Sequence, residues 1–142
     1  MTVYTDSSFI VSLYLVDRYS QEAWRRILLS PRILLTPFHR AEFTHAVQQH
    51  VFRQLISAQE AQKTLKNFDI DSASGSWVKV VFPEAAFETC AALAQRHVAT
   101  LGVRTLDSLH VACALELKVQ KFWTFDERQL RLAEAVGLDT TA

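Results

Sequence analysis

Apolar residues along this chain form short continuous runs that alternate with longer segments in which they recur at helical spacing. A short continuous run is typical of a strand buried on both faces of a parallel sheet. Such runs predict strands at 2–5, 32–36, 77–82 and 121–125, with room for a short fifth strand at the C-terminus. Helical spacing predicts helices at about 7–17, 20–29, 37–55, 57–70, 83–100, 105–117 and 126–137. This alternation indicates a single α/β domain over residues 1–142, with a mainly parallel central sheet of four or five strands flanked by helices.

Residues that cap helices mark several of these boundaries. Thr36 precedes Pro37, and this pair is typical of an N-cap followed by the first helical residue. Ser57 is the predicted N-cap of the next helix, and Thr105 has the same predicted role for the helix that follows it. The segment 71–76 is rich in serine and contains a glycine, so we predict a loop there.

The helix predicted at 105–117 is apolar on most of its surface and is therefore expected to lie inside the protein. Its main apolar stripe consists of Leu106, Leu109, Cys113 and Leu117. Asp107 lies in the first turn of this helix, where a carboxylate complements the positive end of the helix dipole. Burying a carboxylate costs free energy unless positive or hydrogen-bonding groups contact it. We therefore expect other polar groups beside Asp107.

Acidic residues adjoin the carboxyl ends of several predicted strands, which is where parallel α/β sheets bind ligands. These residues are Asp6, Glu42, Asp107 and Asp126. Taken singly, each has a structural explanation. Aspartates are good N-caps, Asp126 has Gln129 where a capping-box partner belongs, and Glu42 fits an exposed helix position. Capping alone does not require these side chains to point toward one another, and Glu42 is not a cap. We therefore predict that the carboxylates lie together at one edge of the sheet.

Clustered carboxylates repel one another strongly, so we expect a hard cation to compensate them. Carboxylate and water ligands suit Mg²⁺ or Mn²⁺, whereas Zn²⁺ prefers histidine or cysteine. Such ions activate a water and stabilise the leaving oxygen at a phosphodiester, which is the chemistry of two-metal nucleases.

The motifs around these acids resemble those of a known family. Asp6 follows the first strand, Glu42 ends Thr-Pro-x-x-x-x-Glu, Asp107 lies in Arg-x-x-Asp-x-Leu-His-x-Ala, and Asp126 ends Thr-x-Asp. In this order and spacing the chain resembles a PIN domain, and more narrowly the VapC-type toxins of bacterial toxin–antitoxin pairs. The resemblance covers essentially the whole chain. It implies a Mg²⁺- or Mn²⁺-dependent endoribonuclease that acts on RNA such as tRNA or rRNA, is inhibited by a cognate antitoxin and forms a homodimer.

The resemblance also implies roles for individual residues. The metal-binding and catalytic acids would be Asp6, Glu42, Asp107 and Asp126. Ser7 and Thr124 would support them through hydrogen bonds to a carboxylate or a water. Arg104 either contacts phosphate or pairs with an acid, and His110 is interpreted as a core histidine.

Other residues that carry possible RNA-binding chemistry are interpreted structurally. The predicted surface positions of the helix that carries Glu42 are His39, His45 and His50. The arginines assigned to solvated faces are Arg18, Arg25, Arg26, Arg40 and Arg53. The rings assigned to the core or to an interface are Tyr14, Trp24 and Phe38.

Composition narrows these predictions. Fifteen basic and fifteen acidic residues give zero formal net charge, so the chain lacks the basic excess of many dedicated nucleic-acid binders. No apolar run approaches the roughly 20 residues that span a bilayer. The N-terminus has no signal-peptide pattern, so we expect a cytoplasmic protein without membrane contact. Cys90 and Cys113 are predicted to be small core residues, not a disulfide or a zinc site.

Three other interpretations stay open at this point. A phospho-receiver domain also places acids and Mg²⁺ at strand ends, but it needs a lysine after a late strand, and residues 124–126 contain none. A non-catalytic PIN-like scaffold would bind RNA or a partner through the same surface, although retention of all the acids disfavours it. An RNA-processing PIN nuclease without an antitoxin would use the same site.

Overall fold

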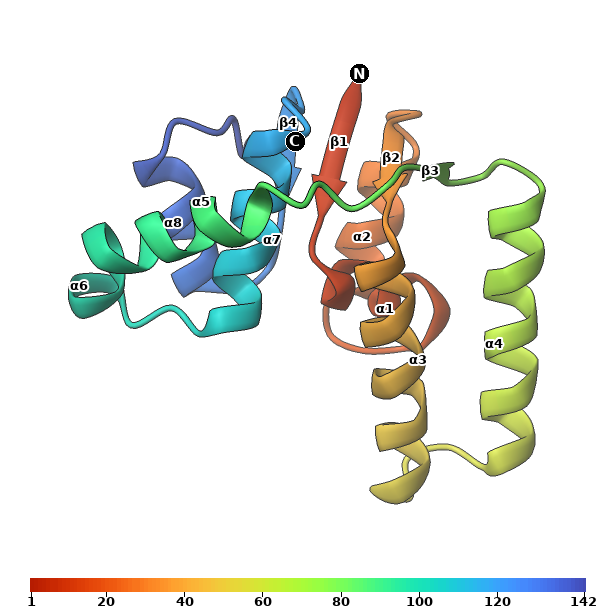
Figure 1. The fold of residues 1–142 in the computed structure, drawn as a ribbon. Helices are drawn as coiled ribbons and strands as arrows, with labels where there is room; N and C mark the ends of the chain where they lie inside the picture. Colours follow the sequence, from red (N-terminus) through yellow and green to blue (C-terminus); the bar gives the residue numbers. More distant parts are fainter.

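The computed structural model describes residues 1–142 and has one parallel sheet between two groups of helices (Figure 1). Its strands are β1 (Thr2–Thr5), β2 (Arg32–Leu35), β3 (Val78–Lys79) and β4 (Lys121–Trp123). They lie in the order β3-β2-β1-β4, and every neighbouring pair is parallel. The predicted α/β fold with a parallel central sheet is therefore confirmed, with four strands.

The helices fill the connections between the strands. They are α1 (Ser7–Tyr14), α2 (Ser20–Ile27), α3 (Pro37–Phe52), α4 (Ala58–Ala73), α5 (Ala86–Leu93), α6 (Ala99–Leu101), α7 (Thr105–Glu116) and α8 (Glu127–Ala135). A π-helical turn, Ala94–Val98, joins α5 to α6, so one helical stretch covers most of the segment predicted at 83–100. Gly102 ends this stretch at a φ of +67°, a left-handed conformation that glycine adopts without strain. None of the helices combines the length and apolar character needed to cross a membrane.

Side chains that alternate along the strands supply two hydrophobic cores, one on each face of the sheet. Val3 and Trp123 belong to the core shared with α1, α2, α3 and α4. Tyr4 and Phe122, their neighbours in the chain, belong to the core shared with α5, α7 and α8. Figure 1 shows the same division, with α1–α4 on one side of the sheet and α5–α8 on the other.

Local capping signals explain where most helices begin. The Thr36 side chain accepts the backbone N–H of His39, with Pro37 at the first helical position, and Ser57 forms a capping box with Glu60. Both predicted N-caps are confirmed. The prediction for Thr105 is wrong, because Thr105 is already helical and Arg104 is the N-cap, without a side-chain capping bond.

The helix α7 is buried as predicted, with one exception. Residues 108–114 are all buried, including Cys113, and Cys90 on α5 is also buried, with neither cysteine in a disulfide. Leu106 is 51% exposed, because it lies in the first turn, beyond the reach of the core. The apolar stripe therefore starts at Leu109 and not at Leu106.

Two boundaries differ from prediction for tertiary reasons. The third strand is confined to Val78–Lys79 because its only neighbour, β2, ends where α3 begins, and the backbone N–H of Val80 makes the last bond to the Leu35 carbonyl. Helix α4 extends into the segment predicted as a loop, 71–76, and ends at Ala73. Asp71, within that last turn, accepts a 2.5 Å hydrogen bond from the Tyr14 hydroxyl, which ties the end of α4 to α1.

No fifth strand forms at the C-terminus. The Phe122 N–H donates to the Asp139 carbonyl at 2.9 Å, and the Trp123 indole N–H donates to the Thr141 carbonyl at 3.0 Å. These bonds hold the C-terminal segment beside β4, but they do not continue into a ladder.

Candidate active site

The predicted acids line one pocket of about 470 Å³. Asp6, Glu42, Asp107 and Asp126 all lie on its wall, as do Ser7 and Arg104. They come from four separate parts of the chain: the end of β1, helix α3, the first turn of α7 and the segment after β4. The predicted convergence at the carboxyl edge of the sheet is observed.

Asp6 is buried and saturated with hydrogen bonds. It is the N-cap of α1, where its Oδ1 accepts the Phe9 N–H at 3.1 Å. Its Oδ2 accepts the Ser8 hydroxyl at 2.7 Å and the Thr124 hydroxyl at 3.2 Å. Asp6 is only 4% exposed, and this burial raises the pKa of its carboxyl above the ordinary value. The structural role of a cap and a place in the acidic pocket thus coexist in one residue.

Glu42 belongs to a hydrogen-bonded chain that crosses the sheet edge. Its Oε1 accepts the Ser7 hydroxyl at 2.8 Å and is also bonded to His110 Nε2. On the other side of its ring, His110 Nδ1 lies 2.8 Å from the Tyr4 hydroxyl. Burial opposes ionisation of Glu42, but the bonds from His110 and Ser7 outweigh it and lower the pKa of Glu42. The carboxylate is therefore held ionised and in one orientation.

Asp107 is partly exposed and pairs with an arginine. Its Oδ2 is 3.3 Å from Arg104 Nε, and the side chains of Asp107 and Arg104 are 22% and 80% exposed. Burial raises the pKa of Asp107; Arg104 opposes this rise, and the charge of Asp126 adds to it. Of the two roles left open for Arg104, the structure shows the pairing with an acid.

Asp126 caps α8, and its Oδ1 accepts the Gln129 N–H at 2.8 Å. The predicted capping box is wrong, because the Asp126 N–H donates to the Thr124 hydroxyl at 3.0 Å instead of to the Gln129 side chain. Gln129 is fully buried, and its Nε2 donates to the Asp107 carbonyl at 3.0 Å. Gln129 therefore ties α8 to α7 and sets the position of Asp107 relative to Asp126.

Ser7 and Thr124 make the kind of bonds predicted for them. Ser7 bonds to Glu42, and the Thr124 hydroxyl links two acids, donating to Asp6 and accepting from the backbone of Asp126. Thr124 is 5% exposed and does not itself line the pocket.

Two histidines contribute more than the sequence indicated. His110 is buried as predicted, but it also lines the pocket and bonds Glu42. Its position three residues after Asp107, on the same helix face, was the available signal. His39 is fully buried, so its predicted surface position is wrong. Its Nε2 donates to the Thr5 carbonyl at 2.8 Å and its Nδ1 accepts the Thr36 N–H, and burial lowers the pKa of His39 to about 3.

Most of the other basic and aromatic candidates lie away from the acids. Of the arginines, only Arg104 lines the pocket; Arg25 and Arg26 bind Glu22, and Arg40 lies 3.7 Å from Asp69.

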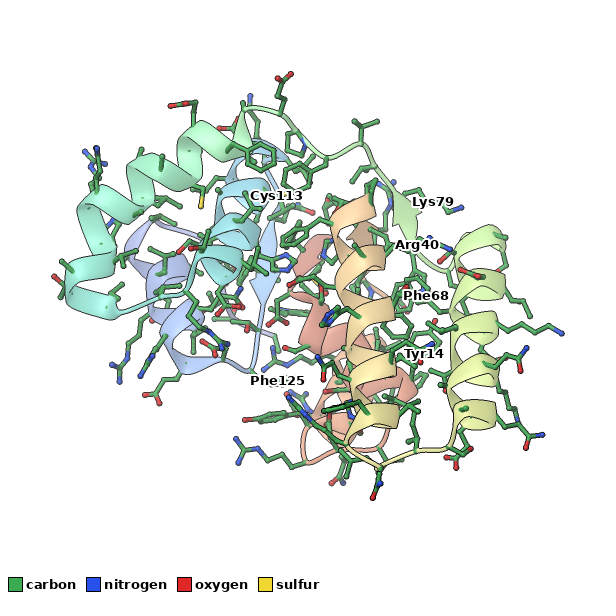
Figure 2. All side chains as sticks on the ribbon, turned by 60° about the horizontal axis from the view of Figure 1, so that its bottom comes forward. Tyr14, Arg40, Phe68, Lys79, Cys113 and Phe125 are labelled. Carbon is green, nitrogen blue, oxygen red and sulfur yellow. The ribbon has the colours of Figure 1, made fainter.

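The rings interpreted as core or interface residues behave differently from one another. Tyr14 packs against Phe43 and Phe68, Phe38 stacks on His110, and Trp24 is 54% exposed. Figure 2 shows Tyr14 and Phe68 in the layer that includes α4. His50, predicted at the surface, also lines the pocket. The lining residues that were not singled out from the sequence are Ser8, Val11, Ser12, Asp17, Tyr19, Ala46 and Phe125.

The donor chemistry of the pocket suits a hard cation. Its acids offer carboxylate oxygens, and no trio of histidine, cysteine, aspartate or glutamate side chains is grouped tightly enough to enclose an ion alone. Mg²⁺ keeps several waters and is commonly held by one or two carboxylates, so a looser arrangement is adequate. Burial raises the pKa of Asp6 and of Asp107, and the charge of Asp126 raises that of Asp107 further, so a bound cation would favour the ionised form of both.

Residues 3–135 match the family model of the PIN domain, so the chain belongs to the PIN domain family. This membership agrees with the resemblance read from the motifs and removes the phospho-receiver alternative. No curated protein sequence matches the chain.

Solved structures with the same fold include several toxin–antitoxin proteins. The Mycobacterium tuberculosis toxin VapC20, described as cleaving the sarcin–ricin loop, has a TM-score of 0.68 at 16% identity, covering 98% of each chain. VapBC2 from Rickettsia felis, bound to a promoter DNA fragment, has a TM-score of 0.69 at 13% identity and full coverage of both chains. FitAcB from Neisseria gonorrhoeae has a TM-score of 0.68 at 16% identity, covering 99% of this chain and 96% of that one.

Proposed function

We propose that this protein is a Mg²⁺- or Mn²⁺-dependent endoribonuclease and the toxin of a toxin–antitoxin pair. The observation that carries the proposal is the convergence of Asp6, Glu42, Asp107 and Asp126 on one pocket in a chain of the PIN domain family. Nuclease activity is the function that this family membership supports best.

The acids divide the work of holding a metal ion. Asp107 and Asp126 are the proposed principal ligands, because the charge of Asp126 acts on Asp107 and both also line an adjoining pocket of about 300 Å³. Glu42 and Asp6 are proposed to hold ions or their waters from the opposite wall. A bound Mg²⁺ or Mn²⁺ would polarise the phosphodiester and lower the pKa of an attacking water.

The chain's own groups orient this chemistry. Ser7 and His110 fix the Glu42 carboxylate, while Thr124 fixes Asp6 and the start of α8. Arg104, largely exposed at the rim, is free to exchange its contact with Asp107 for a substrate phosphate.

The partner proposal rests on the solved structures. VapBC2 and the Klebsiella pneumoniae toxin–antitoxin complex, which has a TM-score of 0.61 at 14% identity, are similar in fold to this chain. We infer that a cognate antitoxin binds this protein and that an antitoxin arginine pairs with the pocket acids. A homodimer is also proposed, and size-exclusion chromatography with light scattering measures it directly.

The test is cleavage of total tRNA and rRNA by the purified protein in Mg²⁺, Mn²⁺ or EDTA, with Asp107→Asn in parallel. We expect discrete fragments that require metal and a loss of more than about a hundredfold in the variant, since even groups that only support metal ligands are worth 10–100-fold. Glu88→Gln, which neutralises an exposed acid on α5 outside the pocket, serves as the matched control. Cleavage by Asp107→Asn at the wild-type rate would show that the acidic pocket is not the active site.

The toxin assignment has its own test. Induced expression of the wild-type protein is expected to arrest bacterial growth. Induced expression of Asp107→Asn is expected to leave growth unchanged. Normal growth despite RNA cleavage in vitro would favour the RNA-processing alternative. Binding of RNA without cleavage by a folded, metal-loaded protein would favour the non-catalytic scaffold.

A further inference from the structure

A layered stack of planar groups runs from the core to the rim of the acidic pocket. Phe9 is fully buried, and its ring stacks on Phe125 with centroids 5.3 Å apart and planes 16° apart. Phe125 stacks in turn on Tyr19, at 4.7 Å and 2°. The guanidinium carbon of Arg18 lies 4.6 Å from the centre of the Tyr19 ring, and Arg18 is exposed. Tyr19 and Phe125 both line the pocket that contains the acids.

The loop that carries Tyr19 is held in place by hydrogen bonds. Asp17 Oδ1 accepts the Tyr19 N–H at 2.8 Å, and Asp17 Oδ2 accepts the Ser12 hydroxyl from α1 at 2.8 Å. The Asp17 N–H donates to the Ser20 hydroxyl at 2.9 Å. The Tyr19 ring is therefore positioned before any ligand arrives, which lowers the entropic cost of binding on it.

The two ends of the stack differ in what covers them. The inner end is closed by the core around Phe9, whereas at the outer end the exposed guanidinium of Arg18 lies over the Tyr19 ring and donates to the Tyr19 hydroxyl. Figure 2 labels Phe125 near the boundary between the C-terminal helices and the α1–α3 side of the molecule. A stack that ends in an exposed planar cation beside a phosphodiester-binding pocket has the form of a platform for nucleobases, which stack on aromatic rings and on guanidinium planes.

We propose that an unpaired base of the RNA substrate extends this stack at Arg18 and Tyr19, and so places its neighbouring phosphate at the acids. This inference rests on the proposed ribonuclease function and assigns the residues that hold the base beside the reacting phosphate. A base inside a duplex has both faces covered by its neighbours and offers no free face to the stack.

The test measures binding in EDTA, where cleavage does not occur. The probe is a short single-stranded RNA with one 2-aminopurine, whose fluorescence is quenched on stacking, and the same strand in a duplex is the comparison. Tyr19→Leu keeps an apolar contact with Phe125 but removes the ring. We expect roughly tenfold weaker binding of the single strand and loss of the quenching, within the range of one base–aromatic stack. Tyr19→Phe keeps the ring and removes only the hydroxyl that accepts from Arg18, so it is expected to retain the quenching and most of the affinity.

Phe87→Leu is the matched control, since Phe87 is a 59% exposed ring on α5 outside the pocket. Thermal unfolding establishes that each variant is folded. Wild-type affinity and quenching in Tyr19→Leu would overturn the proposal, and so would an equal loss of duplex binding. Failure of the wild-type protein to cleave RNA in Mg²⁺ would count against the nuclease function and would leave the binding result intact.

Discussion

The two walls of the acidic pocket are built differently. On one wall, Asp6 and Glu42 are held by a buried set of hydroxyl, imidazole and backbone donors. On the other wall, Asp107 and Asp126 are partly exposed, repel one another and also line an adjoining pocket of about 300 Å³. The walls differ in hydrogen bonding more than in exposure, because the Glu42 side chain is 26% exposed and the Asp107 side chain 22%, and only Asp6 is buried.

This contrast separates folding from chemistry. A carboxylate that accepts several internal hydrogen bonds contributes to the fold, and removing it leaves donors without partners. A raised pKa, found for both Asp6 and Asp107, means that ionisation costs stability, but only Asp6 also caps a helix and accepts two side-chain hydroxyls. Substitutions on the two walls should therefore have the same effect on activity and different effects on stability.

The largest expected difference in stability is between Asp6→Ala and Asp107→Ala. Asp6→Ala removes the cap of α1 and leaves the Ser8 and Thr124 hydroxyls without an acceptor, so we expect a loss of about 1–3 kcal/mol in the free energy of unfolding. Asp107→Ala should cost less than about 0.5 kcal/mol, like most surface substitutions. Urea unfolding in EDTA measures both. Equal losses of unfolding free energy in the two variants would contradict the difference proposed between the two walls.

The next effect concerns the hydroxyl that joins the walls. Thr124→Val keeps the side-chain shape but removes the bond to Asp6 and the acceptor for the Asp126 N–H. We expect RNA cleavage to fall about 10- to 100-fold, as for other groups that orient metal ligands. Thr124→Ser is the control and should retain most of the activity. Unchanged cleavage in Thr124→Val would mean that Asp6 is positioned without this bond.

The pH dependence of stability gives a smaller signal with a definite sign. The pKa of Asp107 is raised above its ordinary value of 3.8, so the folded protein binds this proton more tightly than the unfolded chain does. Ionisation therefore destabilises the fold as pH rises from 3.8 through the folded pKa, and the penalty persists above it. Asp107→Asn should become more stable relative to the wild type across that window, in EDTA. Free energies of unfolding that change in parallel with pH in the two proteins would contradict this prediction. In saturating Mg²⁺ we expect the wild type to be the more stable of the two.

A small stability effect is also expected at Arg104. Its contact with Asp107 is an exposed pair, so Arg104→Gln should change the free energy of unfolding by less than about 1 kcal/mol. If Arg104 exchanges this contact for a phosphate, KM for RNA should rise with kcat almost unchanged. Steady-state kinetics at two salt concentrations tests this. A fall in kcat alone would instead point to a role in holding Asp107.

Sequence signals that act within a few residues predicted their structures well. The pair Thr36-Pro37 and the capping residue Ser57 start helices as expected, and the apolar runs mark the four parallel strands. The carboxyl-edge rule for parallel sheets was enough to place four acids from distant parts of the chain on one pocket. These signals succeed because their physical basis lies in local backbone geometry or in the topology of the sheet.

The partners of the site residues depended on packing. His110 bonds Glu42 across 68 positions of sequence, and Thr124 bonds Asp6 across 118. The local sequence pattern predicted Gln129 as a capping-box partner of Asp126. Its side chain instead donates to the Asp107 carbonyl, because α8 packs against α7.

The sequence by itself thus determined the order of strands and helices along the chain, the helix starts set by Thr36 and Ser57, and which acids meet. Only the tertiary structure decided that His39 is buried, that Tyr19 stacks on Phe125, and that hydroxyl and imidazole groups from other elements hold Asp6 and Glu42. The physical reason is the distance along the chain over which each interaction acts. Caps and apolar periodicity act over one helical turn, whereas burial and hydrogen bonds between distant segments exist only after the two cores have packed on the sheet.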